Sequence, residues 1–225
     1  MSVFVTGTDT DVGKTIVSAT ILAGYQSLGA AYWKPIATGG TEESDSRTIL
    51  ELAPPGTHVL PEVYSFRAPV SPHLAARLEE RPIQRQVVLS AFQNNLDTDR
   101  PLVIEGIGGL LVPLNEDGWL LADLLSEVGL PVVLVASTRV GTINHTLLSL
   151  EAAHQRGLLM LGVVFNGPRN PSNLEAVERF GGVPVIGHLG QLERVDAQSV
   201  SRASESFDLG SRLLRALQGT ETPNG

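Results

Sequence analysis

The stretch that decides the fold is Val3-Phe4-Val5-Thr6-Gly7-Thr8-Asp9-Thr10-Asp11-Val12-Gly13-Lys14-Thr15. Its apolar start predicts a buried strand, and the apolar-periodic segment 16–28 predicts a helix. A strand, a glycine-bracketed loop ending in Gly-Lys-Thr and a helix are together the context of a phosphate-binding loop. Backbone N–H groups of such a loop, and of the first helical turn, converge on a polyphosphate. We therefore expect Lys14 to neutralise the β- and γ-phosphates and the Thr15 hydroxyl to ligate Mg²⁺.

The spacing of this loop is unusual. Five residues separate Gly7 from Gly13, whereas the common pattern has four. The terminal Gly13-Lys14-Thr15 and the flanking strand and helix still favour a phosphate site over an ordinary turn between a strand and a helix.

Composition excludes several classes of function. The chain has 225 residues, a net charge of −8 and no cysteine, so disulfides, thiolate nucleophiles and cysteine-ligated zinc are ruled out. The acidic balance argues against a nucleic-acid partner, but it is compatible with ATP, whose phosphates meet local backbone dipoles. The chain starts directly on a strand, and no apolar run approaches the roughly 18–20 residues that span a bilayer. We expect a cytoplasmic protein without a membrane partner.

The lysine content draws attention to a second position. The sixteen basic residues include only two lysines, Lys14 and Lys34. An arginine fork cannot replace a compact ammonium in a tight pocket, so a chain that otherwise uses arginine has a reason to keep lysine at these positions. The alternative is a solvated surface lysine at position 34.

Apolar segments without alternation recur along the chain, which is typical of a parallel sheet covered on both faces. We predict further strands at 30–35, 101–105, 131–136, 158–165 and 183–187. We predict helices at 44–52, from Pro72 onward, and at 84–96, 119–128, 145–156, 171–180 and 196–217. Segment 36–41 is expected to be a polar loop, 53–72 an irregular excursion and 110–118 a hairpin-like loop. The result is one doubly wound α/β domain of the P-loop NTPase type over residues 1–218, with about seven strands and a frayed tail at 219–225.

Polar residues follow several of these strands, at the edge where open α/β sheets bind ligands. Glu105 ends a predicted strand and is a candidate to hold Mg²⁺ opposite the phosphate loop. Asp45 is a second metal candidate, although capping of the helix at 44–52 explains it equally well. Lys34 ends the strand after the first helix, so it can share a crevice with Lys14, and Thr38 can contact a phosphoryl acceptor there.

Two further turns carry a possible binding role. The turn Val140-Gly141-Thr142-Ile143-Asn144-His145 leads into a helix and could hold a carboxylate, or be a plain turn capped by Thr142 or Asn144. Asn166 could hydrogen-bond a base edge, or simply form an Asn-Gly turn. The five histidines lack metal-ligand spacing, and there is no Gly-x-Ser-x-Gly motif of a serine hydrolase.

Taken in order, five motifs make the chain resemble dethiobiotin synthetase. They are Gly7-Thr-Asp-Thr-Asp-Val-Gly-Lys-Thr15, Lys34-Pro-Ile-Ala-Thr-Gly39, Ser71-Pro-His73, Glu105-Gly-Ile-Gly-Gly109 and Gly141-Thr-Ile-Asn-His145. The five-residue gap in the phosphate loop is that family's own spacing. The resemblance implies an ATP- and Mg²⁺-dependent cyclo-ligase of biotin biosynthesis, usually a homodimer. Such an enzyme converts 7,8-diaminononanoate and CO₂ to dethiobiotin through a carbamate and a carbamic–phosphoric mixed anhydride.

The resemblance also implies roles for individual residues. The catalytic residues implied are Lys34, Lys14, Thr10 and Asp11. The ATP contacts implied are Asp11, Val12, Gly13, Lys14, Thr15, Ile16, Asp45, Glu105, Gly106, Ile107, Gly108, Asn166 and Gly167. The metal ligands implied are Thr15, Asp45 and Glu105. The substrate contacts implied are Thr38 and, across a dimer interface, Gly141, Thr142, Ile143 and Asn144.

Three other classes of P-loop protein compete with this interpretation. A partition-type ATPase switch, which binds without ligating a small molecule, carries a lysine five residues before the loop lysine, where this chain has Asp9. A GTPase switch needs an Asn-Lys-x-Asp motif, and the chain has no Asn-Lys pair. An amidotransferase-type synthetase needs a longer chain and a cysteine nucleophile.

Overall fold

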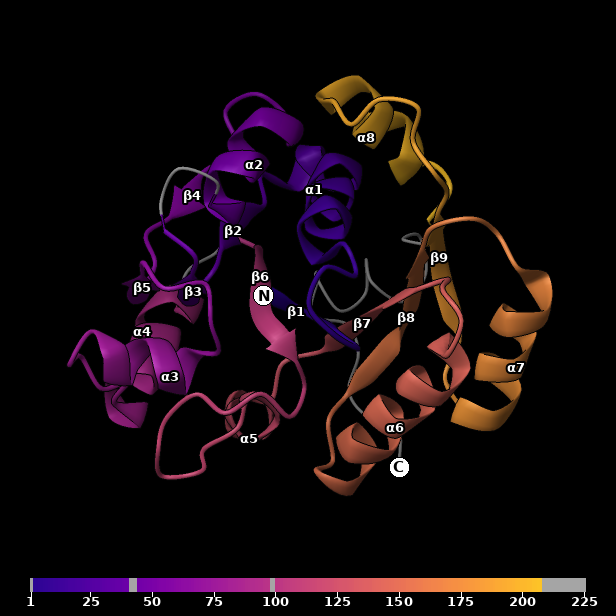
Figure 1. The fold of residues 1–225 in the computed structure, drawn as a ribbon. Coiled ribbons are helices and arrows are strands. Elements are labelled where there is room, and N and C mark those ends of the chain that lie inside the picture. The colour runs from indigo at the N-terminus through magenta and orange to yellow at the C-terminus, as the bar shows by residue number, and fades with distance from the viewer. Residues whose placement is uncertain (1, 41–43, 98–99, 208–225) are drawn as a thin grey trace.

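The structure is a computed structural model that describes residues 2–40, 44–97 and 100–207. Its centre is a seven-stranded sheet in the order β4-β2-β6-β1-β7-β8-β9, in which neighbouring strands pair in parallel (Figure 1). The strands are β1 (Ser2–Gly7), β2 (Ala31–Trp33), β4 (Val59–Leu60), β6 (Leu102–Gly109), β7 (Val132–Ser137), β8 (Met160–Asn166) and β9 (Val185–Leu189). This confirms the predicted mostly parallel sheet of about seven strands.

Helices cover both faces of the sheet (Figure 1). One face is covered by α1 (Lys14–Gly24), α2 (Asp45–Leu52) and α8 (Ala197–Ser204), and a short 3₁₀ turn (Gln26–Leu28) follows α1. The other is covered by α3 (Pro72–Leu78), α4 (Arg85–Leu96), α5 (Leu121–Val128), α6 (Thr142–Gln155) and α7 (Pro171–Gly181). Within residues 2–40, 44–97 and 100–207, no helix is long and apolar enough to cross a membrane.

A hydrophobic core lies on each face of the sheet, which explains why the strand sequences are continuous apolar runs. Successive side chains of a strand point to opposite faces, so a strand buried on both faces needs apolar residues at every position. In β1, Val3 and Val5 enter the core beneath α1, whereas Phe4 enters the core on the other side. The sheet is therefore the middle layer of a three-layer α/β sandwich.

The topology places the phosphate loop at the centre of the sheet. β1 lies between β6 and β7; the chain first builds outward to β2 and β4 on one side and later to β8 and β9 on the other. Such a change of winding direction opens a crevice at the carboxyl ends of the strands, where open α/β sheets bind ligands. The loop that follows β1 lies at this point.

Two segments that were expected to be loops contain strands. β3 (Ile36–Thr38) and β5 (Tyr64–Phe66) form a separate two-stranded parallel sheet, and β4 lies in the supposedly irregular excursion 53–72. The expectation failed because strands of two or three residues are too short to show a period. Their pairing with residues about thirty positions away is decided by tertiary contacts.

Two element ends also differ from the predictions. β6 continues past Glu105 to Gly109, because Gly106 lets the strand pass close to Phe4: a Cβ there would lie 2.7 Å from the Phe4 ring. α8 ends at Ser204, so the helix predicted to continue from position 196 is interrupted there by a turn, which brings Phe207 against Gly187. The predicted helix end at 217, the boundary at 218 and the tail 219–225 lie outside the described residues.

Candidate active site

The phosphate loop is shaped by its two glycines. A Cβ on Gly7 would lie 2.7 Å from Val12 Cγ2 and 2.9 Å from the Asp9 carbonyl oxygen, so the turn after β1 excludes larger residues. Gly13 has φ 93° and precedes α1, and no side chain among the described residues caps that helix. The N–H groups of its first turn therefore remain available to an anion. Lys14 Nζ donates to the Asp9 carbonyl at 2.9 Å, which folds the lysine back over the loop.

A compact ionic cluster lies beside this loop. Lys34 Nζ is 2.5 Å from Asp45 Oδ2 and 3.0 Å from Glu105 Oε1. Thr15 Oγ1 lies 2.7 Å from Asp45 Oδ1 and 3.0 Å from Glu105 Oε1. A hydroxyl carries one proton, so Thr15 donates to one carboxylate at a time. The cluster joins the four residues that sequence reasoning had proposed from four separate segments.

Each member of the cluster comes from a different element. Lys34 follows β2, Glu105 lies within β6, and Asp45 is the first residue of α2. The Ser44 side chain accepts a hydrogen bond from Arg47 N and so caps α2. Because Ser44 is the cap, the Asp45 carboxylate is turned toward Lys34 and Thr15, which removes helix capping as the explanation of Asp45.

Tyr32 also belongs to this cluster, and sequence reasoning did not find it. Its hydroxyl donates to Glu105 Oε2 at 3.0 Å, and the side chain is fully buried. In the sequence, Tyr32 looks like one more apolar residue of a β-strand. The feature that could have revealed it is the tyrosine hydroxyl, which needs a polar partner in a strand predicted to be buried on both faces.

Burial and charge act in opposite directions on the two lysines. Burial lowers the pKa of Lys14, and the neighbouring Lys34 ammonium lowers it further. Burial also disfavours the charged form of Lys34, but Glu105 and Asp45 outweigh it and raise the pKa of that lysine. Burial likewise opposes ionisation of Asp45, yet Lys34 and Thr15 lower the pKa of its carboxyl. Lys34 is thus held as an ammonium against at least one carboxylate.

The oxygen atoms of the cluster suit a hard cation such as Mg²⁺. Asp45 Oδ1 and Glu105 Oε1 both lie within hydrogen-bond distance of Thr15 Oγ1, and Mg²⁺ prefers oxygen ligands. Among the described residues, no group of three or more histidine, cysteine, aspartate or glutamate side chains could hold a metal ion. This pattern fits Mg²⁺, which commonly binds one or two carboxylates and takes its other ligands from water and substrate phosphates.

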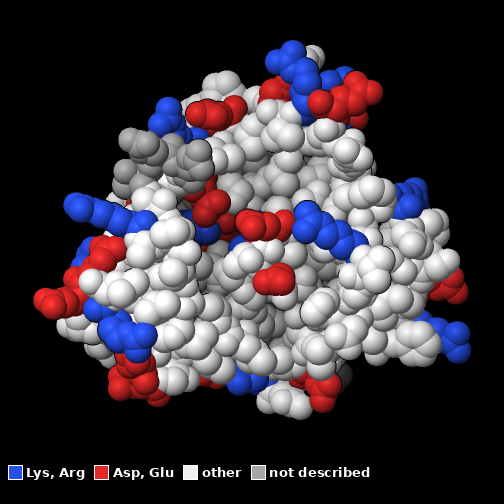
Figure 2. All heavy atoms as spheres, in the orientation of Figure 1, with Lys and Arg blue, Asp and Glu red and all other residues white. Residues whose placement is uncertain are grey.

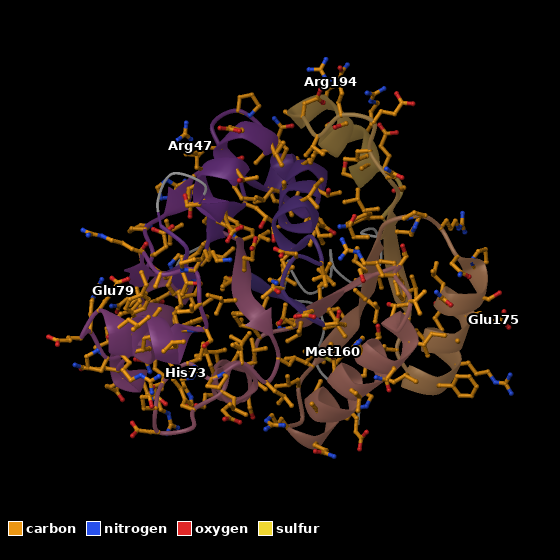
Figure 3. The ribbon with its side chains drawn as sticks, viewed as in Figure 1. Arg47, His73, Glu79, Met160, Glu175 and Arg194 are labelled. Carbon is orange, nitrogen blue, oxygen red and sulfur yellow. The ribbon has the colours of Figure 1, made fainter. Side chains whose placement is uncertain are left out.

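A cavity of about 690 Å³ opens above the cluster. Figure 2 shows acidic and basic side chains gathered around the hollow at the middle of this face. The cations that line the cavity are Lys14 and Lys34, whereas Arg47 and Arg194 point outward in Figure 3. The predicted residues on its wall are Thr10, Asp11, Gly13, Lys14, Thr15, Lys34, Thr38, Asp45, Glu105, Ile107 and Gly108. Segment 69–72 and Val112 complete the wall and were not predicted to do so.

A second cavity of about 410 Å³ lies on the other side of the phosphate loop. It is lined by the predicted residues Asp11, Val12, Ile16, Asn166 and Gly167, and by others from the ends of β7 and β9. Asn166 Nδ2 donates to the Val12 carbonyl at 3.0 Å, and a Cβ on Gly13 would lie 2.0 Å from the same nitrogen. The Asn166 amide therefore supports the phosphate loop, and the same residue lines the cavity.

The predicted carboxylate turn is separate from this site. Gly141 precedes α6 with φ 93°, and Thr142 Oγ1 donates to the Ser137 carbonyl oxygen at 2.5 Å. Neither of the two cavities described above is lined by residues 141–144. The structure thus brings together the residues of the phosphate loop, β2, α2 and β6, but not this turn.

Comparison with known proteins identifies the family. Residues 1–199 match a family model described as an AAA domain. The "ATP-dependent dethiobiotin synthetase BioD" of Paramagnetospirillum magneticum is 47% identical over 199 residues, which cover 88% of this chain and 92% of the relative. The protein of the same name from Nitrobacter hamburgensis is 47% identical over 218 residues, 96% of this chain and 97% of the relative. The chain belongs to the dethiobiotin synthetase family.

As a member of the dethiobiotin synthetase family, the chain is an enzyme, a ligase. Among solved structures, the pNOB8 ParA protein bound to nonspecific DNA matches with a TM-score of 0.64. That match covers 98% of this chain and 99% of the ParA chain, at 12% identity. A likeness at that identity shows a shared P-loop fold and says nothing about a shared partner.

Proposed function

We propose that this chain is an ATP- and Mg²⁺-dependent ligase of biotin biosynthesis that converts 7,8-diaminononanoate and CO₂ to dethiobiotin, ADP and phosphate. The observation that carries this proposal is the cluster of Lys34, Asp45, Glu105 and Thr15 beside the phosphate loop, in which Lys34 and Glu105 are buried. The names of relatives that align over almost their whole length support it.

The proposed reaction has three bond-forming steps. One amine of the substrate adds to CO₂ and loses a proton, giving a carbamate. A carbamate oxygen attacks the γ-phosphorus of ATP, the bond to the bridging oxygen breaks, and ADP leaves. The second amine then attacks the carbamoyl carbon and loses a proton; the carbon–oxygen bond breaks, phosphate leaves and the ureido ring closes.

The chain's own residues supply binding and charge for these steps. We assign the triphosphate to the loop N–H groups and Lys14, and the carbamate to Lys34, whose charge is maintained by two carboxylates. Placing ammonium groups where negative charge develops lowers the barrier to phosphoryl transfer. Thr15, Asp45 and Glu105 would hold Mg²⁺, which neutralises phosphate charge when bound.

We assign the remaining contacts by position. Thr38 and segment 69–72 line the larger cavity and would contact the diamine, with Thr10 and Asp11 at its rim. Asn166 and Gly167 line the smaller cavity and would contact adenine. Residues 141–144 lie outside both cavities, so a role in binding the substrate carboxylate requires a second subunit. We therefore propose a homodimer that places this turn at the neighbouring active site.

The deciding experiment supplies diaminononanoate, ¹⁸O-labelled bicarbonate, Mg²⁺ and ATP, and follows both products by mass spectrometry. The proposed mixed anhydride transfers one oxygen of CO₂ to phosphate, so labelled phosphate should appear with the ureido product. Glu105→Gln should abolish both signals, whereas Glu51→Gln, at an exposed position on α2, should leave them unchanged. ATP hydrolysis that ignores the diamine would refute the ligase function.

A further inference from the structure

Tyr32 and Glu105 are brought together by the geometry of neighbouring parallel strands. Tyr32 of β2 pairs with Val103 of β6, and Glu105 lies two residues further along β6, on the same face as Val103. A two-residue step along a strand is roughly 6.6 Å, about the reach of a tyrosine side chain. Trp33 points to the other face, where its ring nitrogen donates to the Pro61 carbonyl. Only the residue at position 32 can reach Glu105 from β2.

The two oxygens of Glu105 have different surroundings. Oε2 accepts the Tyr32 hydroxyl at 3.0 Å. Oε1 faces Thr15 Oγ1 at 3.0 Å and Lys34 Nζ at 3.0 Å. Glu105 is itself 1% exposed, so solvent does not supply a partner for Oε2. The tyrosine therefore binds one carboxylate oxygen, and the ionic cluster binds the other.

We propose that Tyr32 is a positioning residue that leaves Glu105 one oxygen for the cation of the active site and thereby favours Mg²⁺ over Ca²⁺. This rests on the proposed function, in which Glu105 is a metal ligand. Mg²⁺ requires near-octahedral oxygen ligands at close range, whereas the larger Ca²⁺ accepts carboxylates through one or both oxygens. Outer partners that orient a ligand commonly change metal affinity 10- to 100-fold.

The test is Tyr32→Phe, which keeps the ring and removes the donor. Tyr64→Phe is the matched control, because the Tyr64 side chain is also buried and its hydroxyl accepts a hydrogen bond from Gln84 N at 3.2 Å, outside the cluster. The dissociation constants of Mg²⁺ and Ca²⁺ are measured by calorimetry on each protein saturated with ADP. Tyr32→Phe should weaken Mg²⁺ binding about 10- to 100-fold and Ca²⁺ binding by less than about threefold.

Two results would overturn the proposal. One is a folded Tyr32→Phe protein whose Mg²⁺ dissociation constant stays within about twofold of the parent value; the other is an equal loss for both cations. A coupling test adds Glu105→Gln: in that background Tyr32→Phe should change Mg²⁺ affinity no further, since the ligand that it orients is gone.

A measurement on the unaltered chain does not depend on the variant folding. The infrared difference spectrum on adding Mg²⁺ to the ADP-bound parent, assigned with Glu105→Gln, should show the wide splitting of carboxylate stretches that marks coordination through one oxygen. A narrow splitting, which marks two-oxygen coordination, would refute the role of Tyr32. A parent that makes no ureido product would refute the proposed function instead.

Discussion

The turns that precede α1 and α6 both end in a glycine in the left-handed conformation. Each follows one of two adjacent parallel strands, β1 and β7, and each ends in a glycine with φ 93° immediately before a helix. At both helix starts, the described residues provide no side-chain cap for the first turn. By local structure alone, either turn could receive an anion.

Their surroundings separate them. The turn at Gly13 faces the cluster of Lys34, Asp45 and Glu105, with Lys14 buried above it. The turn at Gly141 lies at the surface beside the fully exposed Val140, and its residues 141–144 line neither of the two cavities. A helix start becomes an active site when neighbouring elements bring charged side chains to it.

Lys34 is part of what distinguishes the turn at Gly13 from the turn at Gly141, and its removal should have the largest effect of the substitutions considered. Lys34→Gln should lower turnover by about 1,000-fold or more, because it removes the ammonium assigned to the carbamate and the transferring phosphoryl group. ATP affinity should stay within about tenfold, roughly 1.4 kcal/mol, because the loop and Lys14 remain. Steady-state kinetics and nucleotide titration measure the two quantities, with Arg47→Gln at an exposed position as the control. Lost ATP affinity with intact chemistry in the bound complex would refute this role.

Alanine at each of the two glycines compares the turns directly. Both substitutions place a side chain at φ 93°, which costs on the order of 1–3 kcal/mol. At Gly13 the new Cβ would also lie 2.0 Å from Asn166 Nδ2, whereas at Gly141 the nearest atoms are His145 ring atoms at 3.5 Å. We expect Gly13→Ala to reduce ATP affinity about 100-fold and Gly141→Ala to lower thermal stability without changing ATP affinity. Equal effects of both on ATP affinity would contradict the comparison.

The proposed role of the second turn can be tested at Asn144, which is exposed on α6. If this turn holds the substrate carboxylate of a neighbouring subunit, Asn144→Ala should raise the KM for diaminononanoate about tenfold, roughly 1.4 kcal/mol. The KM for ATP and the melting temperature should not change. An unchanged KM for the diamine would remove this turn from the proposed active site.

A smaller effect is expected from the contact between β8 and the phosphate loop. Asn166→Ala removes the hydrogen bond to the Val12 carbonyl, and a single such bond contributes about 1 kcal/mol. We expect ATP affinity to fall about fivefold and, because Asn166 lines the second cavity, the preference for ATP over GTP to narrow. Nucleotide titrations measure both, and an unchanged preference would leave Asn166 with loop support alone.

The smallest expected effect is a dependence of stability on acid pH. The folded state lowers the Asp45 pKa below 3.8, because Lys34 and Thr15 favour the carboxylate more strongly than burial opposes it. A depressed carboxyl pKa gives stability that is present above the unfolded value and lost as pH falls through the folded one. As the pH falls below about 4, the free energy of unfolding, measured with urea, should therefore decrease more for the parent than for Asp45→Asn. An equal loss of unfolding free energy in the two proteins as the pH falls would contradict this prediction.

Periodicity and motif spacing were sufficient for the long elements and for most of the ionic cluster. β1, β7 and β8 are buried over almost their whole length and α1 over most of its length, and their apolar pattern shows it. Lys14, Thr15, Lys34 and Glu105 lie at or near the ends of such elements, where parallel topology brings them to one edge of the sheet. β3, β4 and β5 were missed because two- or three-residue strands have no detectable period, and the wall at 69–72 was missed because an irregular segment has none.

By itself, the sequence determined the parallel sheet, the phosphate loop and the family, because burial on both faces and a glycine-shaped loop leave patterns along the chain. The tertiary structure alone decided that Ser44 rather than Asp45 caps α2, that Asn166 supports the phosphate loop, and that Tyr32 holds Glu105. The contacts of Asn166 and Tyr32 join residues far apart in the sequence and depend on how the strands pair. The Ser44 cap is local, but the ion pair with Lys34 and the hydrogen bond with Thr15 draw the Asp45 side chain away from capping. That arrangement turns a common helix start after β1 into a charged site, while the equivalent start after β7 remains a surface turn.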